Sequence, residues 1–508
     1  MGGTSALIGR LKTSARGRSS VVGHSRIAGS PGRRPSPAEA SLDPTVLDED
    51  VEDGATTARR WPPHRDRLWE FVALASVAIA IPLAWWIAST LLVAGNGFND
   101  FHDFYLAAQL ITQGQSPYDK AALSELARSE GLHFVVGTGY SYPLPFALAM
   151  VPFVALPFTA AVLVFNGLSL AVFGLTVAAW IGRAHGWEPT LRRRRFVLAC
   201  AAAVYPSVYG TIANGQAGLV LLPLLGLGTM AAVDQGQGSR RFLGGIAIGL
   251  AAIVKLTPGL LAVPMLLGRQ VRAAMGLVLG AVGALVAATL VVPWAGQGSE
   301  GMMSLLEPDS YFTNQSINGV VTRLVLPSER TVPLWNHGFD PRLPVLVLTG
   351  AFALLTLLIL RKARRTLGER RGLALGIGLA LVSGLIGAPK GTYWNQVMVL
   401  VPAGLLLAVE VPDLRIGRLG HIDLALLACW LAGTTVQTLL WMSPPPSTGT
   451  LAPVVTLLTS SSVYGLVALW LVLARRLLMP RSSGQAVTDA FEPVAETAAL
   501  RSGDHQGG

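Results

Sequence analysis

Long apolar runs recur along the chain from Phe71 almost to its C-terminus. Many of them approach the roughly 20 residues that a helix needs to cross a bilayer. Lysines and arginines are concentrated in the short segments between these runs, as in the run from Arg192 to Arg195, and such basic segments usually lie on the cytoplasmic side. The pattern predicts an all-α, polytopic integral membrane protein with about 12 transmembrane helices and both termini in the cytoplasm.

Two apolar stretches are too short for ordinary spans. Residues 242–254 and 256–268 meet at Lys255-Leu256-Thr257-Pro258 and have basic residues at both outer ends, so we expect a hairpin of two short helices. Segment 141–158 is bounded by prolines on both sides, and we expect it to be re-entrant or to lie at the outer interface. With these choices every large basic loop is cytoplasmic. Interrupted segments of this kind often line a binding cavity.

The chain divides into three parts. Residues 1–67 are rich in Gly, Ser, Pro and Arg and have no apolar periodicity, so they are expected to form a disordered cytoplasmic tail. Residues 68–475 form the transmembrane domain, and residues 476–508 form a second disordered cytoplasmic tail. Two outer loops are long, at 95–140 and 294–341, and the first should contain short amphipathic helices at 103–113 and 119–130. Functional residues tend to lie on long loops.

Composition supports a membrane protein. The chain is 51% hydrophobic and 13% charged, whereas a soluble domain has about 25% charged residues. The net charge of +10 could indicate a nucleic-acid partner, but the basic residues lie between apolar runs, so we expect membrane lipids and no nucleic acid. Cys200 and Cys429 lie inside apolar runs and are interpreted as buried hydrophobic residues. The sequence has no metal-ligand spacing, Walker loop or Ser-His-Asp order, so neither a metal nor a cofactor is predicted.

Asp100 follows the first apolar run directly and is the candidate catalytic base. An ionisable group at the mouth of a membrane helix is costly unless it faces a polar cavity. Asp103 lies three residues further on, which places both carboxylates on one helix face. The alternative is that Asp100 caps a helix that begins near Phe101, and that Asp103 favours the helix dipole.

Two cations are candidates for binding an anion. Lys255 lies within an apolar stretch with no obvious acidic partner at similar depth, and a lipid phosphate would satisfy it. Its alternative role is a lysine that extends to the interface from a helix end. Arg323 is an outer-side cation that could add to an anion site or face water.

Two polar strings and two aromatic residues complete the candidates. Asn214-Gly215-Gln216 and Asn314-Gln315-Ser316 could bind sugar hydroxyls through directional hydrogen bonds or could form ordinary turns. Tyr142 and Trp394 lie near predicted outer boundaries, where aromatic residues form either an interface belt or a platform for a sugar.

The order of these strings resembles that of glycosyltransferase family 87, polytopic enzymes of the GT-C class. The resemblance covers roughly residues 68–475. The matching strings are Asp100-Phe101-x-x-x-Tyr105-x-Ala107, Gly114-x-x-Pro117-Tyr118-Asp119, Tyr142-Pro143, Pro152-Phe153 with Leu156-Pro157-Phe158, Asn214-Gly215-Gln216, Lys255-Leu256-Thr257-Pro258 and Asn314-Gln315-Ser316-x-x-Gly319.

The resemblance implies transfer of a sugar from a polyprenyl phosphate donor to a lipid or glycan acceptor of the cell envelope, at the outer face of the cytoplasmic membrane. The family's catalytic aspartate falls on Asp100, and Asp103 has no fixed counterpart. The substrate-binding candidates are Asp103, Tyr105, Tyr142, Asn214, Gln216, Lys255, Asn314, Gln315, Ser316, Arg323 and Trp394.

The sequence departs from the family pattern at two strings. Tyr142-Pro143-Leu144 stands where the family commonly has Tyr-Pro-Pro, and Trp394-Asn395-Gln396 stands where several mannosyl members resemble Trp-x-His-His. Mannose is the first expectation for the sugar and arabinofuranose the alternative. A secondary transporter or lipid flippase is the competing class, although the sequence has no clear internal repeat.

Overall fold

The computed structural model describes residues 99–132, 139–182, 189–234, 238–295, 307–328, 330–335, 338–411, 419–442 and 452–479. The predicted tail at 1–67, the first apolar run and residues 480–508 lie outside the described residues. Within the described ranges the chain is helical, with isolated bridges at Asn314–Thr392 and Ser328–Thr331 and no strand. The all-α prediction is confirmed for these ranges.

The first half contains helices α2 to α11, with short 3₁₀ segments between some of them. These are α2 (Asn99–Thr112), α3 (Lys120–Ser129), α4 (Leu144–Met150), η1 (Val151–Ala155), α5 (Phe158–Gly182), α6 (Pro189–Ala203), α7 (Pro206–Ala213), α8 (Gly218–Val233), α9 (Gly238–Val254), η2 (Thr257–Leu261), α10 (Ala262–Leu267) and α11 (Val271–Val291).

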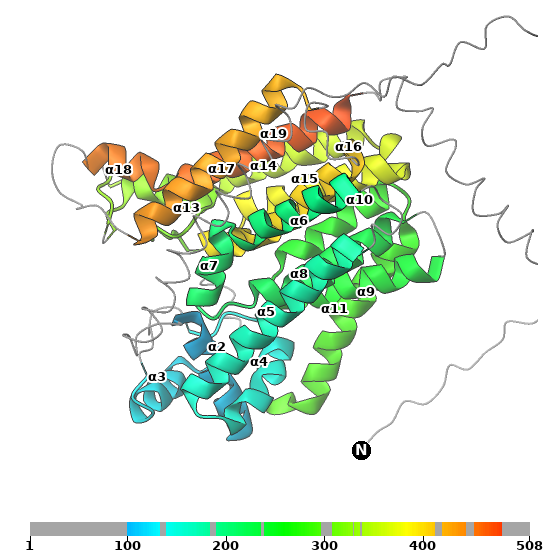
Figure 1. Ribbon diagram of the computed structural model, residues 1–508. Coiled ribbons are helices and arrows are strands. Elements are labelled where there is room, and N and C mark those ends of the chain that lie inside the picture. Colours follow the sequence, from blue (N-terminus) through cyan, green and yellow to red (C-terminus); the bar gives the residue numbers. More distant parts are fainter. Residues whose placement is uncertain are drawn as a thin grey trace, which may run out of the picture. The chain divides into compact units, whose positions relative to one another are not determined.

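The second half continues the helical pattern (Figure 1). Its elements are η3 (Pro293–Ala295), α13 (Ile317–Val325), α14 (Arg342–Lys362), η4 (Thr366–Gly368), α15 (Arg370–Ile386), η5 (Tyr393–Val399), α16 (Leu400–Glu410), α17 (His421–Met442), α18 (Ala452–Leu458) and α19 (Ser461–Leu478). The end of α19 at Leu478 corrects the predicted boundary at 475, because the apolar face of this helix continues to the buried Leu477.

Six helical segments of the described chain are long and apolar enough to cross a membrane. A seventh arises if α6 and α7, which are bent by 43° at the break before Pro206, form one span. Proline disfavours a helical residue before it, which explains the bend. Several spans are therefore present, but the predicted number of about 12 helices is not confirmed.

The predicted hairpin around Lys255 is confirmed. α9 ends at Val254, η2 begins at Thr257, and the returning arm ends at Leu267. Glycines let α9 pack closely against both α8 and α11, which lie beside it (Figure 1). A Cβ atom on Gly249 would lie 2.2 Å from the carbonyl oxygen of Leu277, and a Cβ on Gly244 would lie 2.6 Å from that of Gly228. Small residues at these contacts are typical of membrane helix packing.

The segment predicted to form the first outer loop contains the two predicted short helices, α2 and α3. The carboxylate of Asp119 caps α3 by accepting hydrogen bonds from the backbone N–H groups of Ala121 (2.9 Å) and Ala122 (3.1 Å). The segment formed by α4 and η1 follows and packs against α2. It is shorter than the spanning helices, so it agrees with the prediction that this segment does not cross the membrane by itself.

Buried ion pairs join the ends of α15, α16, α17 and α19. Glu410 accepts from Arg371 (2.5 Å) and Arg476 (3.4 Å), while Asp423 pairs with Arg475 (3.1 Å) and Arg476 (2.6 Å). Both carboxylates are buried. These pairs connect four helices and hold their ends together. The arginines in them belong to the basic segments that the sequence places between apolar runs.

Candidate functional site

Gln216 connects the two ionisable groups that the sequence singles out. Its side-chain N–H donates a hydrogen bond to Asp100 Oδ2, and its Oε1 accepts from Lys255 Nζ at 3.1 Å. The hydroxyl of Tyr142 donates to the same Oε1, also at 3.1 Å. Lys255 Nζ makes a second hydrogen bond, to Asn395 Oδ1. Asp100 and Lys255 therefore lie in one polar group, joined through Gln216.

A turn between α7 and α8 places Gln216 beside α2. Gly215 has a φ angle of +63°, in the left-handed region that favours glycine. A Cβ on Gly215 would lie 2.6 Å from Cβ of Phe101. The backbone N–H of Phe101 also donates to the carbonyl oxygen of Asn214 at 3.2 Å. The turn thus presses against the first turn of α2 and brings Gln216 to Asp100.

Electrostatics distinguish the two aspartates of α2. Burial raises the pKa of Asp100, while the hydrogen bond from Gln216, the charge of Lys255 and the side chain of Trp394 lower that pKa. Burial, followed by the negative charge of Asp100, raises the pKa of Asp103 well above its usual value, and no favourable partner offsets the increase. The pKa of Asp100 is still raised overall, because burial is the largest effect, but among the described residues Asp100 is the one of the two carboxylates whose ionised form neighbouring groups favour.

The expectation that Lys255 has no acidic partner is wrong. Burial lowers the pKa of Lys255, and the opposite charge of Asp100 partly offsets this effect, although Gln216 stands between the two groups. The sequence does not show this relation because the acid lies on α2 and the cation lies at the turn of the hairpin after α9, so only tertiary packing brings them together.

Trp394 and Asn395 reach the site from η5. The hydroxyl of Thr211 donates to the backbone carbonyl of Trp394 at 3.0 Å, which ties η5 to α7. The indole N–H of Trp394 is buried and satisfies no hydrogen bond within the described residues, yet the side chain is near enough to lower the pKa of Asp100. Sequence reasoning missed Asn395 as a site residue. Its signal was its place in the Trp394-Asn395-Gln396 string, where the family pattern is broken.

The string Asn314-Gln315-Ser316 lies in a separate buried network that supports η5. Asn314 Oδ1 accepts from the backbone N–H of Gly391 at 3.1 Å and from the Ser316 hydroxyl at 2.7 Å. Gln315 Nε2 donates to the carbonyl oxygen of Thr459 at 2.6 Å. These hydrogen bonds go to other protein groups, and Asp100 is not among the partners. The described structure therefore does not bring these side chains to Asp100.

Arg323 belongs to the same network. Its guanidinium donates to the carbonyl oxygens of Tyr311 (3.0 Å) and Asn314 (2.7 Å) and to the Ser460 hydroxyl (2.8 Å). The residue is 0% exposed, so it does not face water, and these hydrogen bonds do not join it to the group of Asp100 and Lys255. Its observed contacts are those of a residue that holds the second outer loop against α19.

Two further candidates also bind the backbone. The hydroxyl of Tyr105 donates to the carbonyl oxygen of Leu156 at 2.8 Å and so holds the segment after η1. The side chain of Asn214 donates to the carbonyl oxygen of Gly210 at 2.8 Å, at the end of its own helix. Neither side chain enters the hydrogen bonds around Gln216.

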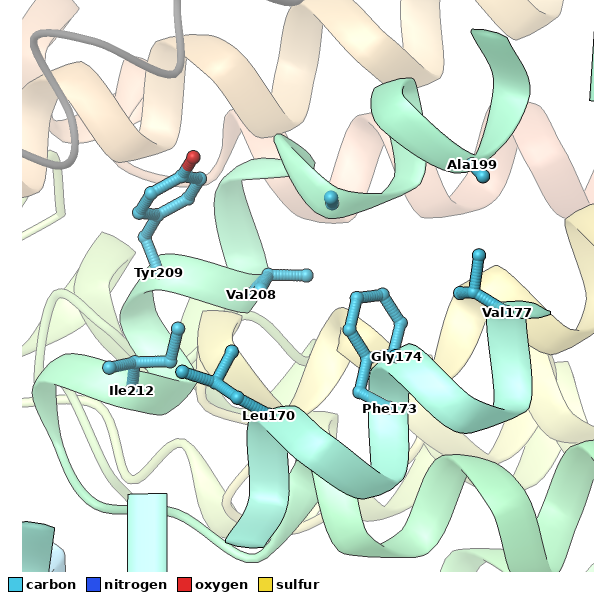
Figure 2. Close-up of a pocket in the computed structure, with 9 residues that line it drawn as sticks. Leu170, Phe173, Gly174, Val177, Ala199, Val208, Tyr209 and Ile212 are labelled. Atoms are coloured by element: carbon cyan, nitrogen blue, oxygen red, sulfur yellow. The ribbon is translucent and has the colours of Figure 1, made fainter. Parts of the chain in front are cut away.

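An apolar cavity of about 340 Å³ lies beside α7, on elements other than those that carry Asp100 and Lys255. Its walls come from α5, α6 and α7 (Figure 2). Leu170 and Phe173 of α5 face Val208 and Ile212 of α7 across it (Figure 2). Among the residues that the structure describes, no group of three or more His, Cys, Asp or Glu side chains could hold a metal ion.

Comparison with protein families gives one match. Residues 140–389 match the model of glycosyltransferase family 87. The match confirms the resemblance that the sequence motifs predict and indicates a membrane glycosyltransferase. It contains Tyr142, Gln216 and Lys255, but it begins after Asp100 and ends before Trp394, so the geometry alone joins those two residues to the site. Comparisons with curated proteins and with solved structures find no match.

Proposed function

We propose that this membrane glycosyltransferase moves one sugar from a polyprenyl phosphate donor to a lipid or glycan acceptor of the cell envelope, at the outer face of the cytoplasmic membrane. The observation that carries the proposal is the shared hydrogen-bonded group of Asp100, Gln216 and Lys255. It combines a carboxylate and a cation, which are the two kinds of group that this transfer needs.

Asp100 is the proposed general base. The acceptor hydroxyl oxygen attacks the anomeric carbon, its proton passes to Asp100, and the bond from that carbon to the phosphate oxygen breaks with its electron pair going to the phosphate. Phosphate is already a good leaving group, so the reaction needs no strong acid. One displacement of this kind inverts the anomeric configuration.

Lys255 is the proposed partner of the departing phosphate. An ammonium group has three N–H donors, and Gln216 and Asn395 take two of them. The third is available for a phosphate oxygen, on which negative charge grows as the sugar leaves. Fixed positive groups that face developing charge stabilise a transition state strongly. The indole N–H of Trp394, whose side chain is near Asp100, is a further donor.

The polyprenyl chain needs an apolar surface that leads to this group. We propose the cavity beside α7 for this role, because it is apolar and Ile212 on its wall lies four residues before Gln216 in the chain. Mannose is the proposed sugar. Arabinofuranose is kept as the alternative, because the Trp394-Asn395-Gln396 string in the site differs from the pattern of several mannosyl members.

The test is transfer by purified protein in liposomes. The protein is supplied with radiolabelled polyprenyl phosphate mannose or polyprenyl phosphate arabinofuranose and with extracted envelope lipids as acceptors. We expect label from one donor to appear in a new glycolipid with inverted anomeric configuration. Retention of configuration with a trapped glycosyl-enzyme, or movement of the intact donor across the bilayer without transfer, would contradict the proposal.

A further inference from the structure

We propose that Gln216 is a positioning residue that holds the base and the cation side by side while preventing them from forming a direct ion pair. This inference rests on the proposed function, in which Asp100 and Lys255 have separate tasks. It assigns Gln216 a role between two protein groups instead of the sugar contact expected from the sequence.

The hydrogen bonds fix the orientation of the Gln216 amide. Its Oε1 lies 3.1 Å from both the Lys255 ammonium and the Tyr142 hydroxyl. An ammonium has no acceptor, so the amide atom facing it must be the oxygen. The amide nitrogen then faces Asp100, whose carboxylate can only accept when ionised. No other orientation satisfies both charged neighbours.

Burial makes this arrangement rigid. Gln216 is 4% exposed, and the turn that carries it is held by the contact of Gly215 with Phe101. Asn395 holds Lys255 from the opposite element, η5. Lys255 is therefore kept between two amide oxygens, both neutral, instead of on a carboxylate.

The separation matters because a direct ion pair would weaken both groups. Direct contact with a cation would lower the proton affinity of the carboxylate further than the neutral amide and the more distant charge do, so Asp100 would be a poorer base. The same contact would occupy Lys255 and oppose its interaction with a phosphate. A neutral amide stabilises the charged forms of both residues without neutralising either one.

Among the residues that the structure describes, few other titratable groups face Asp100. Asp103 lies on its own helix, Lys255 lies at the turn after α9, and Tyr142 precedes α4. Neither Asp103 nor Tyr142 can supply the favourable interaction that Gln216 and Lys255 give to the ionised Asp100. Loss of the Gln216 N–H should therefore make Asp100 harder to ionise.

The experiment replaces Gln216 by Met, which has similar volume and cannot hydrogen-bond as the amide does. Protonation of Asp100 is followed as a function of pH by the infrared carboxyl band of the protein in liposomes. The spectrum of the same protein carrying Asp100→Asn is subtracted, so that the remaining band belongs to Asp100. This readout does not depend on catalysis. A hydrogen bond to a charged group has an energy that corresponds to a shift of about one pH unit or more.

We expect the titration midpoint of this band to move upward by about that amount in Gln216→Met. Where the wild-type protein transfers sugar from radiolabelled polyprenyl phosphate mannose, the acidic limb of the pH–rate profile should move upward by the same amount in Gln216→Met. Asn166→Leu is the comparison variant, because it also removes a buried amide near α7, one that donates to the carbonyl oxygen of Ile212 at 3.2 Å. Its midpoint should not move.

A midpoint in Gln216→Met that stays in place or moves downward would overturn the inference. Gln216→Leu is the second variant if the methionine protein does not fold. A wild-type protein that is inactive with both polyprenyl phosphate mannose and polyprenyl phosphate arabinofuranose, together with a shifted midpoint in Gln216→Met, would instead reject the proposed function and leave the positioning role standing.

Discussion

Asp100 and Asp103 lie within one turn of the same helix but have different neighbours. Asp100 accepts a hydrogen bond from Gln216 and has Lys255 nearby, whereas Asp103 has only burial and the charge of Asp100 acting on its pKa. Sequence spacing places both carboxylates on one face and cannot rank them. The ranking follows from Gln216 in the turn after α7, Lys255 in the turn after α9 and Trp394 on η5, which approach Asp100.

Asp100→Asn should lower turnover by about 10²–10⁴-fold, the usual loss for a positioned general base. The measurement is the initial rate of transfer from radiolabelled polyprenyl phosphate sugar in liposomes. Glu125→Gln on the exposed face of α3 is the control and should keep wild-type turnover. Near-full activity in Asp100→Asn would show that another group takes the proton.

Lys255→Met should lower kcat/KM by about 10²–10³-fold, as expected for loss of one group that stabilises developing negative charge. It should also move the acidic limb of the pH–rate profile upward. The sign follows because Lys255 lowers the pKa of Asp100, so removing the cation raises that pKa, and the base becomes ionised only at higher pH. The exposed Lys362→Met is the control. A profile that shifts to lower pH, or does not shift, would contradict the electrostatic coupling.

At the scale of elements, the second outer loop acts as a support for η5. Tyr393 N–H donates to the carbonyl oxygen of Thr313 at 3.0 Å, and Gln315 N–H donates to that of Gly391 at 2.5 Å. These bonds position the segment that carries Trp394 and Asn395. The polar string that the sequence marks for sugar binding therefore contributes to the site through the backbone beside it.

Arg323→Met should destabilise the protein by about 3 kcal/mol or more, because each buried acceptor left without its donor costs roughly 1–3 kcal/mol. Thermal unfolding in detergent and protease cleavage within the second outer loop measure the effect. The exposed Arg342→Met at the start of α14 is the control. If Arg323 instead binds the donor phosphate, stability would be unchanged and the KM for the donor would rise.

At the scale of the whole molecule, the charged groups divide into two kinds of cluster. The group around Gln216 leaves hydrogen-bonding capacity for a ligand, while the ion pairs of Glu410 and Asp423 with arginines join helix ends to one another. The positive-inside rule assigns the basic ends to the cytoplasm. The polar group that follows the first apolar run is then expected at the outer face.

Cysteine labelling tests this sidedness. In a background with Cys200→Ala and Cys429→Ala, Gln115→Cys lies on the exposed connection before α3, and Arg365→Cys lies on the exposed connection after α14. A membrane-impermeant maleimide should label Gln115→Cys in intact cells and should label Arg365→Cys only after the cells are opened. The reverse pattern would place the Asp100 group in the cytoplasm.

Local sequence was enough to predict much of the helical framework. Helices expected at 103–113 and 119–130 occur as α2 and α3, and the hairpin at Lys255 occurs where two short apolar arms meet. These features follow from the spacing of apolar residues and from prolines and caps, which act over a few residues. The number of helices was less well predicted, because the described chain contains bent and short apolar segments that composition alone counts as full spans.

The amino-acid sequence by itself determined that the chain is helical and membrane-bound, and it marked Asp100, Gln216 and Lys255 as unusual polar residues in apolar surroundings. Only the tertiary structure decided that these three share hydrogen bonds, that Asn395 joins them, and that Arg323 and Asn314 support the fold. The physical reason is the range of the interactions along the chain. Helix formation and membrane insertion depend on neighbours along the chain, whereas a buried polar atom takes its partner from whichever element packs against it.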